Sequence, residues 1–208
     1  VVKKIEAERR PFQKYKTTSP SFDSFVVGPS NKVAYTTTKI IANEPSDQPN
    51  LYLYSGPGLG KTHLMQAICE GVEEKRKTPV YVSAEEFTHD FVTSVQRGAE
   101  SPMAFRQKYR SPDVLLIDDI QFFLGKKKTL EVFLSTISSR SQKKRSVVLA
   151  GDRPPSHFAA LDTRLTSVLS GGLAVSISPP EKETINTIFQ KTCQGLNLKL
   201  SHTIERYI

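Results

Sequence analysis

The chain contains Ser55-Gly56-Pro57-Gly58-Leu59-Gly60-Lys61-Thr62 directly after the β-like run LYLYS (51–55) and directly before a segment of helical period. A glycine loop between a strand and a helix is the setting in which a phosphate-binding loop works. Gly58 and Gly60 let the backbone curl so that successive N–H groups point at phosphate oxygens, and the following helix adds its positive N-terminal end. The alternative is a glycine-rich turn with a surface lysine.

Two residues at the end of this loop carry its chemistry. Lys61 supplies a positive charge for the β and γ phosphates, and the hydroxyl of Thr62 suits a magnesium ligand. The strict pattern has glycine where Ser55 stands, which is a mild departure because the other end of the loop makes the closest phosphate contacts. The sequence therefore predicts a site for ATP with Mg²⁺ at Gly56, Gly58, Leu59, Gly60, Lys61 and Thr62.

Further β-like runs follow at the spacing of alternating strands and helices. They are PVYVSA (79–84), DVLLID (113–118), SVVLAG (146–151) and LAVSIS (173–178). The run 114–117 is apolar without alternation, as parallel strands buried on both faces require. Segments of helical period lie between the runs and would cover the sheet. We therefore expect an α/β fold of three layers around a parallel five-stranded sheet, with the ligand at the carboxyl ends of the strands.

Carboxylates follow two of the predicted strands. Asp118 and Asp119 end the third run, where one carboxylate can hold magnesium through water and the next can orient an attacking water, although such a pair can also be a surface rim. Asp152 follows the fourth run and could sense the γ phosphate, but a turn-forming aspartate explains it equally well. Asp118 is our candidate metal ligand, and Asp119 and Asp152 are our candidate catalytic residues.

The chain is basic, with 29 Lys and Arg against 21 Asp and Glu and a net charge of +8. This balance favours a polyanionic partner, yet lysine clusters such as 126–128 often only keep a surface solvated. The absence of tryptophan favours contact with a nucleic-acid backbone over base stacking. No run approaches the roughly 18 apolar residues of a membrane span, and no signal-like segment begins the chain, so we expect a cytoplasmic protein. We expect His63 to be a helix-packing residue.

Motifs beyond the phosphate loop are specific. They are FDSFVVGPSN (22–31), GLGKTHLMQA (58–67), YVSAEEFTHDFV (81–92), FRQKYRSPDVLLIDDIQFF (105–123), GDRPP (151–155), and RL, GGL and PPEKET between 164 and 184. Together they resemble the AAA+ domain of the bacterial chromosomal replication initiator family, DnaA. The combination of HL after the loop, IDDIQFF and DRPP is far more specific than a generic phosphate loop. The resemblance runs from about Phe22 to the end of the chain.

The resemblance implies an ATP-controlled assembly factor of the P-loop AAA+ class. Such a factor self-associates on binding ATP at a replication origin, opens duplex DNA, and resets by slow, regulatory hydrolysis. The implied site consists of Phe25, Val26 and Val27 around the adenine, the loop residues on the phosphates, Asp118 on magnesium, Asp119 on the hydrolytic water, and Asp152 as first sensor. Val92 and Lys128 fall where the family contacts single-stranded DNA, and Lys126 and Lys127 lie beside them.

Composition and the resemblance together set the expected domain boundaries. Residues 1–20, which are polar and proline-punctuated, are expected to be a linker or arm. The nucleotide-binding core is expected over 21–180, and 181–208 should begin a helical lid that is truncated. Because the chain starts at Val1 and stops within an apolar-periodic stretch, we expect a fragment, with the helix-turn-helix for origin duplex DNA absent.

One departure from the family leaves alternatives open. The family has an arginine finger in the pattern DRLxSRF, and Val168 stands at the finger position here. Arg164 matches only the neighbouring interface arginine. The alternative to an initiator is a diverged regulatory or helicase-loading relative that binds nucleotide and a protein partner, such as a replicative helicase. A metabolic P-loop kinase is a third alternative, for which we locate no acceptor site.

Overall fold

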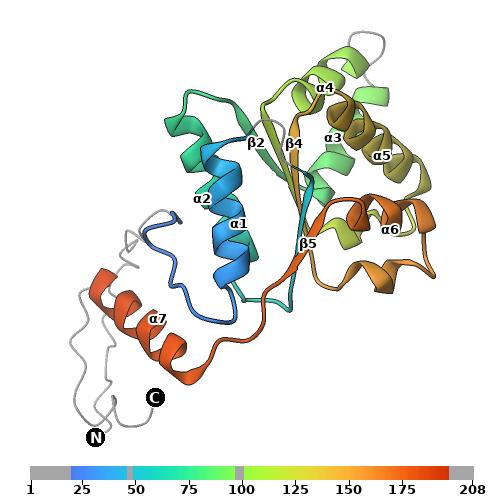
Figure 1. Cartoon of the computed structure of the whole chain (residues 1–208). Coiled ribbons are helices and arrows are strands. Elements are labelled where there is room, and N and C mark those ends of the chain that lie inside the picture. Colours follow the sequence, from blue (N-terminus) through green and yellow to red (C-terminus); the bar gives the residue numbers. More distant parts are fainter. Residues whose placement is uncertain (1–19, 46–48, 97–100, 197–208) are drawn as a thin grey trace, which may run out of the picture.

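The computed structural model describes residues 20–45, 49–96 and 101–196. The expected arm over 1–19 and the last part of the expected lid segment, 197–208, lie outside the described residues. The elements, shown in Figure 1, are α1 (Lys32–Asn43), β1 (Leu51–Tyr54), α2 (Lys61–Glu74), β2 (Pro79–Ser83), α3 (Ala84–Gln96), α4 (Ser101–Arg110), β3 (Val114–Asp118), η1 (Ile120–Phe123), α5 (Lys127–Gln142), β4 (Ser146–Gly151), η2 (Pro155–Phe158), α6 (Thr163–Ser170), β5 (Leu173–Ser176) and α7 (Lys182–Gly195).

The strands form one parallel sheet of five strands in the order β2-β3-β4-β1-β5. Each strand lies within a run predicted from the sequence, and the predicted parallel α/β fold is confirmed. The central strands β3 and β4 are buried along their whole length, which explains their unbroken apolar runs. β5 is an edge strand in which Val175 alone of four residues is buried.

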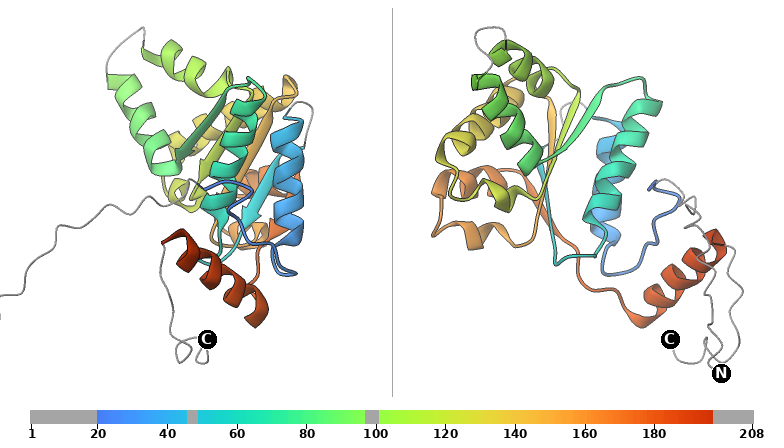
Figure 2. Two further views of the ribbon diagram at one scale, coloured as in Figure 1. Left: turned by 90° about the vertical axis from the view of Figure 1, so that its left-hand side faces the viewer. Right: turned by 180° about the vertical axis from the view of Figure 1, so that it is seen from behind.

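Helices cover both faces of the sheet. α1 and α2 lie on one face, and α3 to α6 lie on the other (Figures 1 and 2). Because successive side chains of a strand point to opposite faces, Leu115 and Ile117 of β3 join the core under α3 to α6, while Val114 and Leu116 join the core under α1 and α2. The result is the three-layer arrangement that the sequence predicts.

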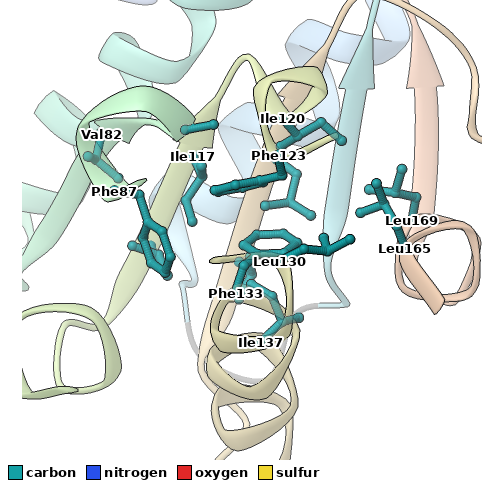
Figure 3. Packing of buried hydrophobic residues seen from close by; sticks show 14 of the residues in the cluster. Val82, Phe87, Ile117, Ile120, Phe123, Leu130, Phe133, Ile137, Leu165 and Leu169 are labelled. Atoms are coloured by element: carbon teal, nitrogen blue, oxygen red, sulfur yellow. The ribbon is translucent and has the colours of Figure 1, made fainter. Parts of the chain in front are cut away.

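Aromatic side chains fill the core under α3 to α6. The ring of Phe87 lies 5.5 Å from that of Phe123 in an edge contact, and Phe123 lies 4.5 Å from Phe133 (Figure 3). All three rings are fully buried. They tie α3, η1 and α5 together directly beside the end of β3, where the candidate carboxylates lie.

A buried arginine fixes α5 to the same side of the sheet. The guanidinium of Arg140 donates to the carbonyls of Pro112 at 2.9 Å, Asp113 at 3.1 Å and Ser146 at 2.8 Å. Burial, assisted by the nearby charge of Arg145, lowers the pKa of Arg140 to about 10. These bonds hold the start of β3 next to the start of β4 beneath α5.

The last helix stands apart from the sheet. α7 follows β5 and lies at the lower end of the molecule beside the segment that precedes α1 (Figure 1). A Cβ placed on Gly28 would lie 2.2 Å from Oγ1 of Thr184, so glycine is needed where this segment meets α7. Within the described ranges, no helix is long and apolar enough to cross a membrane.

Candidate nucleotide-binding site

The glycine loop between β1 and α2 has the backbone that its sequence predicts. Gly58 and Gly60 have φ angles of 74° and 97°, in the left-handed region that side chains disfavour. Gly60 precedes α2, and its carbonyl accepts the N–H of Leu64 at 3.0 Å. A Cβ on Gly60 would also lie 2.9 Å from Cε2 of Phe25. The loop can therefore keep this shape only with glycine at both positions.

The ammonium group of Lys61 lies inside this loop. It donates to the carbonyl oxygens of Ser55 at 2.9 Å and Gly56 at 3.0 Å, and to Oγ of Ser55 at 3.1 Å. Lys61 is only 9% exposed. Ser55, which stands where the strict pattern has glycine, thus supplies an acceptor that helps to hold the lysine.

Three donors fix the carboxylate of Asp118 at the end of β3. Oδ2 accepts from Oγ1 of Thr62 at 2.8 Å and from the hydroxyl of Tyr81 at 3.1 Å. Oδ1 accepts the N–H of Asp119 at 2.8 Å. Asp118 is 3% exposed, so these bonds compensate a buried charge. The structure thus brings the two candidate magnesium ligands into direct contact.

Sequence reasoning missed Tyr81. In the sequence, only its place in the β-like run 79–84 pointed to this region. In the structure, β2 pairs with β3 so that Ser83 lies opposite Asp118, which brings Tyr81 close to the carboxylate. Burial, and after it the charge of Asp118, raises the pKa of Tyr81 and keeps its hydroxyl protonated as a donor.

The other two strand-end carboxylates are more accessible. Asp119 has a left-handed backbone with φ of 57°, and its Oδ1 accepts from Nε2 of Gln121 at 2.9 Å. Asp152 follows β4 and pairs with Arg153 through two contacts of 2.6 and 2.7 Å. The hydrogen bonds from Arg153 lower the pKa of Asp152, and the charge of Lys61 adds to that effect.

A cavity of about 770 Å³ opens beside the glycine loop. Its lining comes from the segment before α1, from the loop at 58–60 and from α7. A volume of this size accommodates a small organic ligand such as a nucleotide. Phe25 and Val26 line it, whereas Val27 lies outside the lining and is 43% exposed. Lys61, Thr62 and the three strand-end carboxylates are not among the residues that line this cavity.

Aromatic contacts fix Phe25 at the cavity wall. Its ring stacks on Tyr35 at 5.9 Å, and His63 makes an edge contact at 5.2 Å. Nε2 of His63 lies 2.9 Å from the carbonyl oxygen of Ser21 and 3.1 Å from Oγ of Ser24. Sequence reasoning placed His63 among the packing residues of its helix, and these polar contacts to the cavity wall carried no signal in the sequence.

The remaining candidates lie away from the cavity. Val92 is 44% exposed on α3. Lys126, Lys127 and Lys128 are exposed at the start of α5. Arg164 is exposed at the start of α6, where Nη2 lies 3.3 Å from Oδ2 of Asp162, the residue that caps the helix.

Val168, at the position where the family has its arginine finger, does not point freely into solvent. It is half-buried on α6 and packs against the core under α3 to α6.

Comparisons with known proteins agree with this geometry. A family described as the bacterial DnaA ATPase domain matches residues 16–176. The chromosomal replication initiator protein DnaA of Nautilia profundicola is 42% identical over 189 residues, which are 90% of this chain and 43% of that protein. Domain III of the Thermotoga maritima replication initiation protein DnaA has a TM-score of 0.84 at 33% identity, covering 92% of this chain and 80% of that one.

A structure of the replication initiator DnaA bound to AMPPCP and single-stranded DNA has a TM-score of 0.83 at 28% identity, covering 92% of this chain and 59% of that one. The parallel sheet and the glycine loop define a P-loop domain of the AAA+ class. The chain belongs to the family of bacterial DnaA ATPase domains. It spans 43% of the length of the Nautilia relative.

Proposed function

We propose that this chain is the ATP-controlled core of a replication initiator, which binds ATP with Mg²⁺, self-associates and contacts single-stranded DNA at an origin. The observation that carries the proposal is the 2.8 Å hydrogen bond from Thr62 to Asp118, which joins the phosphate loop to the end of β3. The cavity lies next to this loop. The relative whose structure contains AMPPCP and single-stranded DNA supports both ligands.

The residues at the site fit a nucleoside triphosphate. When bound, ATP would supply the cleavable phosphate, and Mg²⁺ would neutralise charge on it. Phe25 and Val26 would contact the base from the cavity wall, and Val27, which the resemblance adds to this site, lies next to them in the chain outside the lining. The amides of the loop from Gly56 to Gly60 and the ammonium of Lys61 bind the phosphates.

The donor set also fits magnesium, which prefers oxygen ligands and keeps several waters. Thr62 and Asp118 would hold the ion, Thr62 through its hydroxyl and Asp118 through its carboxylate. Asp119, which is partly exposed, would orient the attacking water. Asp152 detects the γ phosphate through its place after β4, close enough for the charge of Lys61 to act on it. Hydrolysis is slow and serves as a reset.

The proposed DNA contacts are exposed residues of the layer formed by α3 to α6. Val92 on α3 offers an apolar contact, and Lys126, Lys127 and Lys128 offer three positive charges at the start of α5. Several copies held side by side by ATP, with Arg164 at the subunit interface, would line up these lysines along one strand. We assign residues 21–180 to this core and 181–208 to the start of the lid. Within the described part of that segment, α7 lines the cavity.

The proposal is tested by fluorescence anisotropy of a labelled single strand, together with light scattering, with ATP, ADP or no nucleotide. Binding and particle growth that need ATP support it. The same weak binding under all three conditions contradicts it.

A second candidate follows from Val168. Its half-buried packing leaves no guanidinium at the finger position, which favours a regulatory or helicase-loading relative that binds nucleotide and a protein partner. In that case ATP binds tightly, while neither self-association nor strand binding depends on it.

A further inference from the structure

The wall of the cavity begins with a turn over 21–25 that holds its own shape. The N–H of Ser21 donates to Oγ of Ser24 at 2.8 Å, and the N–H of Ser24 donates to Oγ of Ser21 at 3.1 Å. The N–H of Phe25 closes the turn on the carbonyl of Ser21 at 3.2 Å. These local bonds define the turn internally but do not fix its position relative to the phosphate loop.

His63 makes the polar contact between this turn and α2. It lies in the first turn of α2, two residues after Lys61. Because a carbonyl oxygen only accepts, the 2.9 Å contact with Ser21 requires a proton on Nε2. The same imidazole makes an edge contact with the ring of Phe25. One side chain therefore holds both the turn and the aromatic ring that it presents to the cavity.

The turn also has a neighbour on its other side. The ammonium of Lys191 on α7 donates to the carbonyl of Asp23. The turn therefore lies between the helix of the phosphate loop and α7. Loss of the His63 contact would leave it attached to α7 and, through the stacking of Phe25 on Tyr35, to α1.

We propose that His63 is a positioning residue that sets the base-side wall of the cavity against the phosphate loop, so that the affinity for the base depends on it and the affinity for the phosphates does not. The inference deepens the proposed function and rests on it. Gly60 of the phosphate loop lies so close to the Phe25 ring that a Cβ on Gly60 would not fit between them. The base-side wall and the phosphate loop are therefore in close contact. A shift of the turn by a fraction of an ångström thus changes the space for the base.

The test compares the affinities of ATP and of inorganic tripolyphosphate, measured by calorimetry, for the parent chain and for His63→Leu. Loss of one hydrogen bond should weaken ATP binding roughly three- to tenfold. Tripolyphosphate, which has no base, should bind equally to both chains. His63→Gln, whose amide can reach Ser21, should restore most of the ATP affinity.

Controls separate this inference from a structural effect. His89→Leu changes an exposed histidine on α3 and should leave both affinities unchanged. If His63→Leu fails to fold, His63→Asn takes its place, because the shorter amide cannot reach Ser21. Equal ATP affinity in variant and parent, or a parallel loss for ATP and tripolyphosphate, would overturn the inference. A parent chain that binds neither ligand would instead refute the proposed function on which the inference depends.

Discussion

Thr62, at the start of α2, donates a hydrogen bond of 2.8 Å to Asp118, at the end of β3. The two residues are 56 positions apart in the sequence. They meet because β1, which precedes the phosphate loop, and β3 have their carboxyl ends at the same edge of the parallel sheet. Thr62→Val keeps the volume and removes the hydroxyl. We expect it to abolish most of the gain in ATP affinity that magnesium confers, measured by titration with Mg²⁺ and with a chelator.

Thr88→Val is the matched control, since that hydroxyl bonds only within α3, to the carbonyl of Ala84. It should show the magnesium gain of the parent chain. If Thr62→Val shows that gain as well, Thr62 does not bind the metal.

Asp119→Asn should leave ATP affinity unchanged and slow single-turnover hydrolysis. The substitution removes the charge that orients the water. Asparagine is the suitable replacement because Asp119 has a φ of 57°, which asparagine tolerates better than most residues. A hydrolysis rate equal to that of the parent chain would exclude Asp119 as the residue that orients the water.

Replacing Lys126, Lys127 and Lys128 together by alanine should weaken ATP-dependent binding to single-stranded DNA. If all three contact phosphates, the slope of log affinity against log salt concentration becomes shallower by up to about 2. ATP affinity should not change, because these lysines lie on α5 away from the cavity. Anisotropy at several salt concentrations measures both quantities.

A second triple variant, with Lys32, Lys39 and Lys182 changed to alanine, removes the same charge from exposed positions on α1 and α7. Its salt slope should stay close to that of the parent chain. Equal slopes for all three proteins would leave the lysines at the start of α5 as a solvated surface.

The contact between α3 and α4 should make stability depend on pH. Partial burial alone would raise the pKa of Asp90, but hydrogen bonds from Lys108 at 2.6 Å and Tyr109 at 2.7 Å outweigh it and lower that pKa. A lowered pKa in the folded state means that the stabilisation is present above the usual value of 3.8 and is lost as the pH falls through the folded value.

Asp90→Asn should therefore reduce the free energy of unfolding at pH 7 by about 1 kcal/mol, given solvent screening of a partly exposed pair. Urea unfolding measures it, and the difference from the parent chain should shrink in acid. A difference that stays constant from neutral pH to below the pKa of Asp90 would show that charge is not its cause.

The sequence was sufficient for the scaffold of the site. Apolar runs long enough to be strands, glycines at positions that need a positive φ, and carboxylates at strand ends are local patterns, and Gly58, Gly60 and Asp118 lie where those patterns predict. The contacts of Tyr81 and His63 were not predictable in this way. Tyr81 reaches Asp118 only because of the register between β2 and β3, and His63 reaches Ser21 only because the segment before α1 folds back over α2.

The environment of Val168 was likewise not predictable from the sequence. The sequence shows which residue stands at the finger position, but not that its side chain packs against the core. The structure supplies that environment, which depends on how α6 lies on the sheet.

In the proposed function, the loop around Lys61 binds the phosphates of ATP. Lys61→Ala should reduce ATP affinity roughly 10- to 100-fold, because charge-assisted hydrogen bonds to the phosphates are lost. Equilibrium titration with a labelled nucleotide in the presence of Mg²⁺ measures this directly, with thermal unfolding to confirm that the variant is folded. A folded Lys61→Ala chain that binds ATP as tightly as the parent would contradict the assignment of this loop.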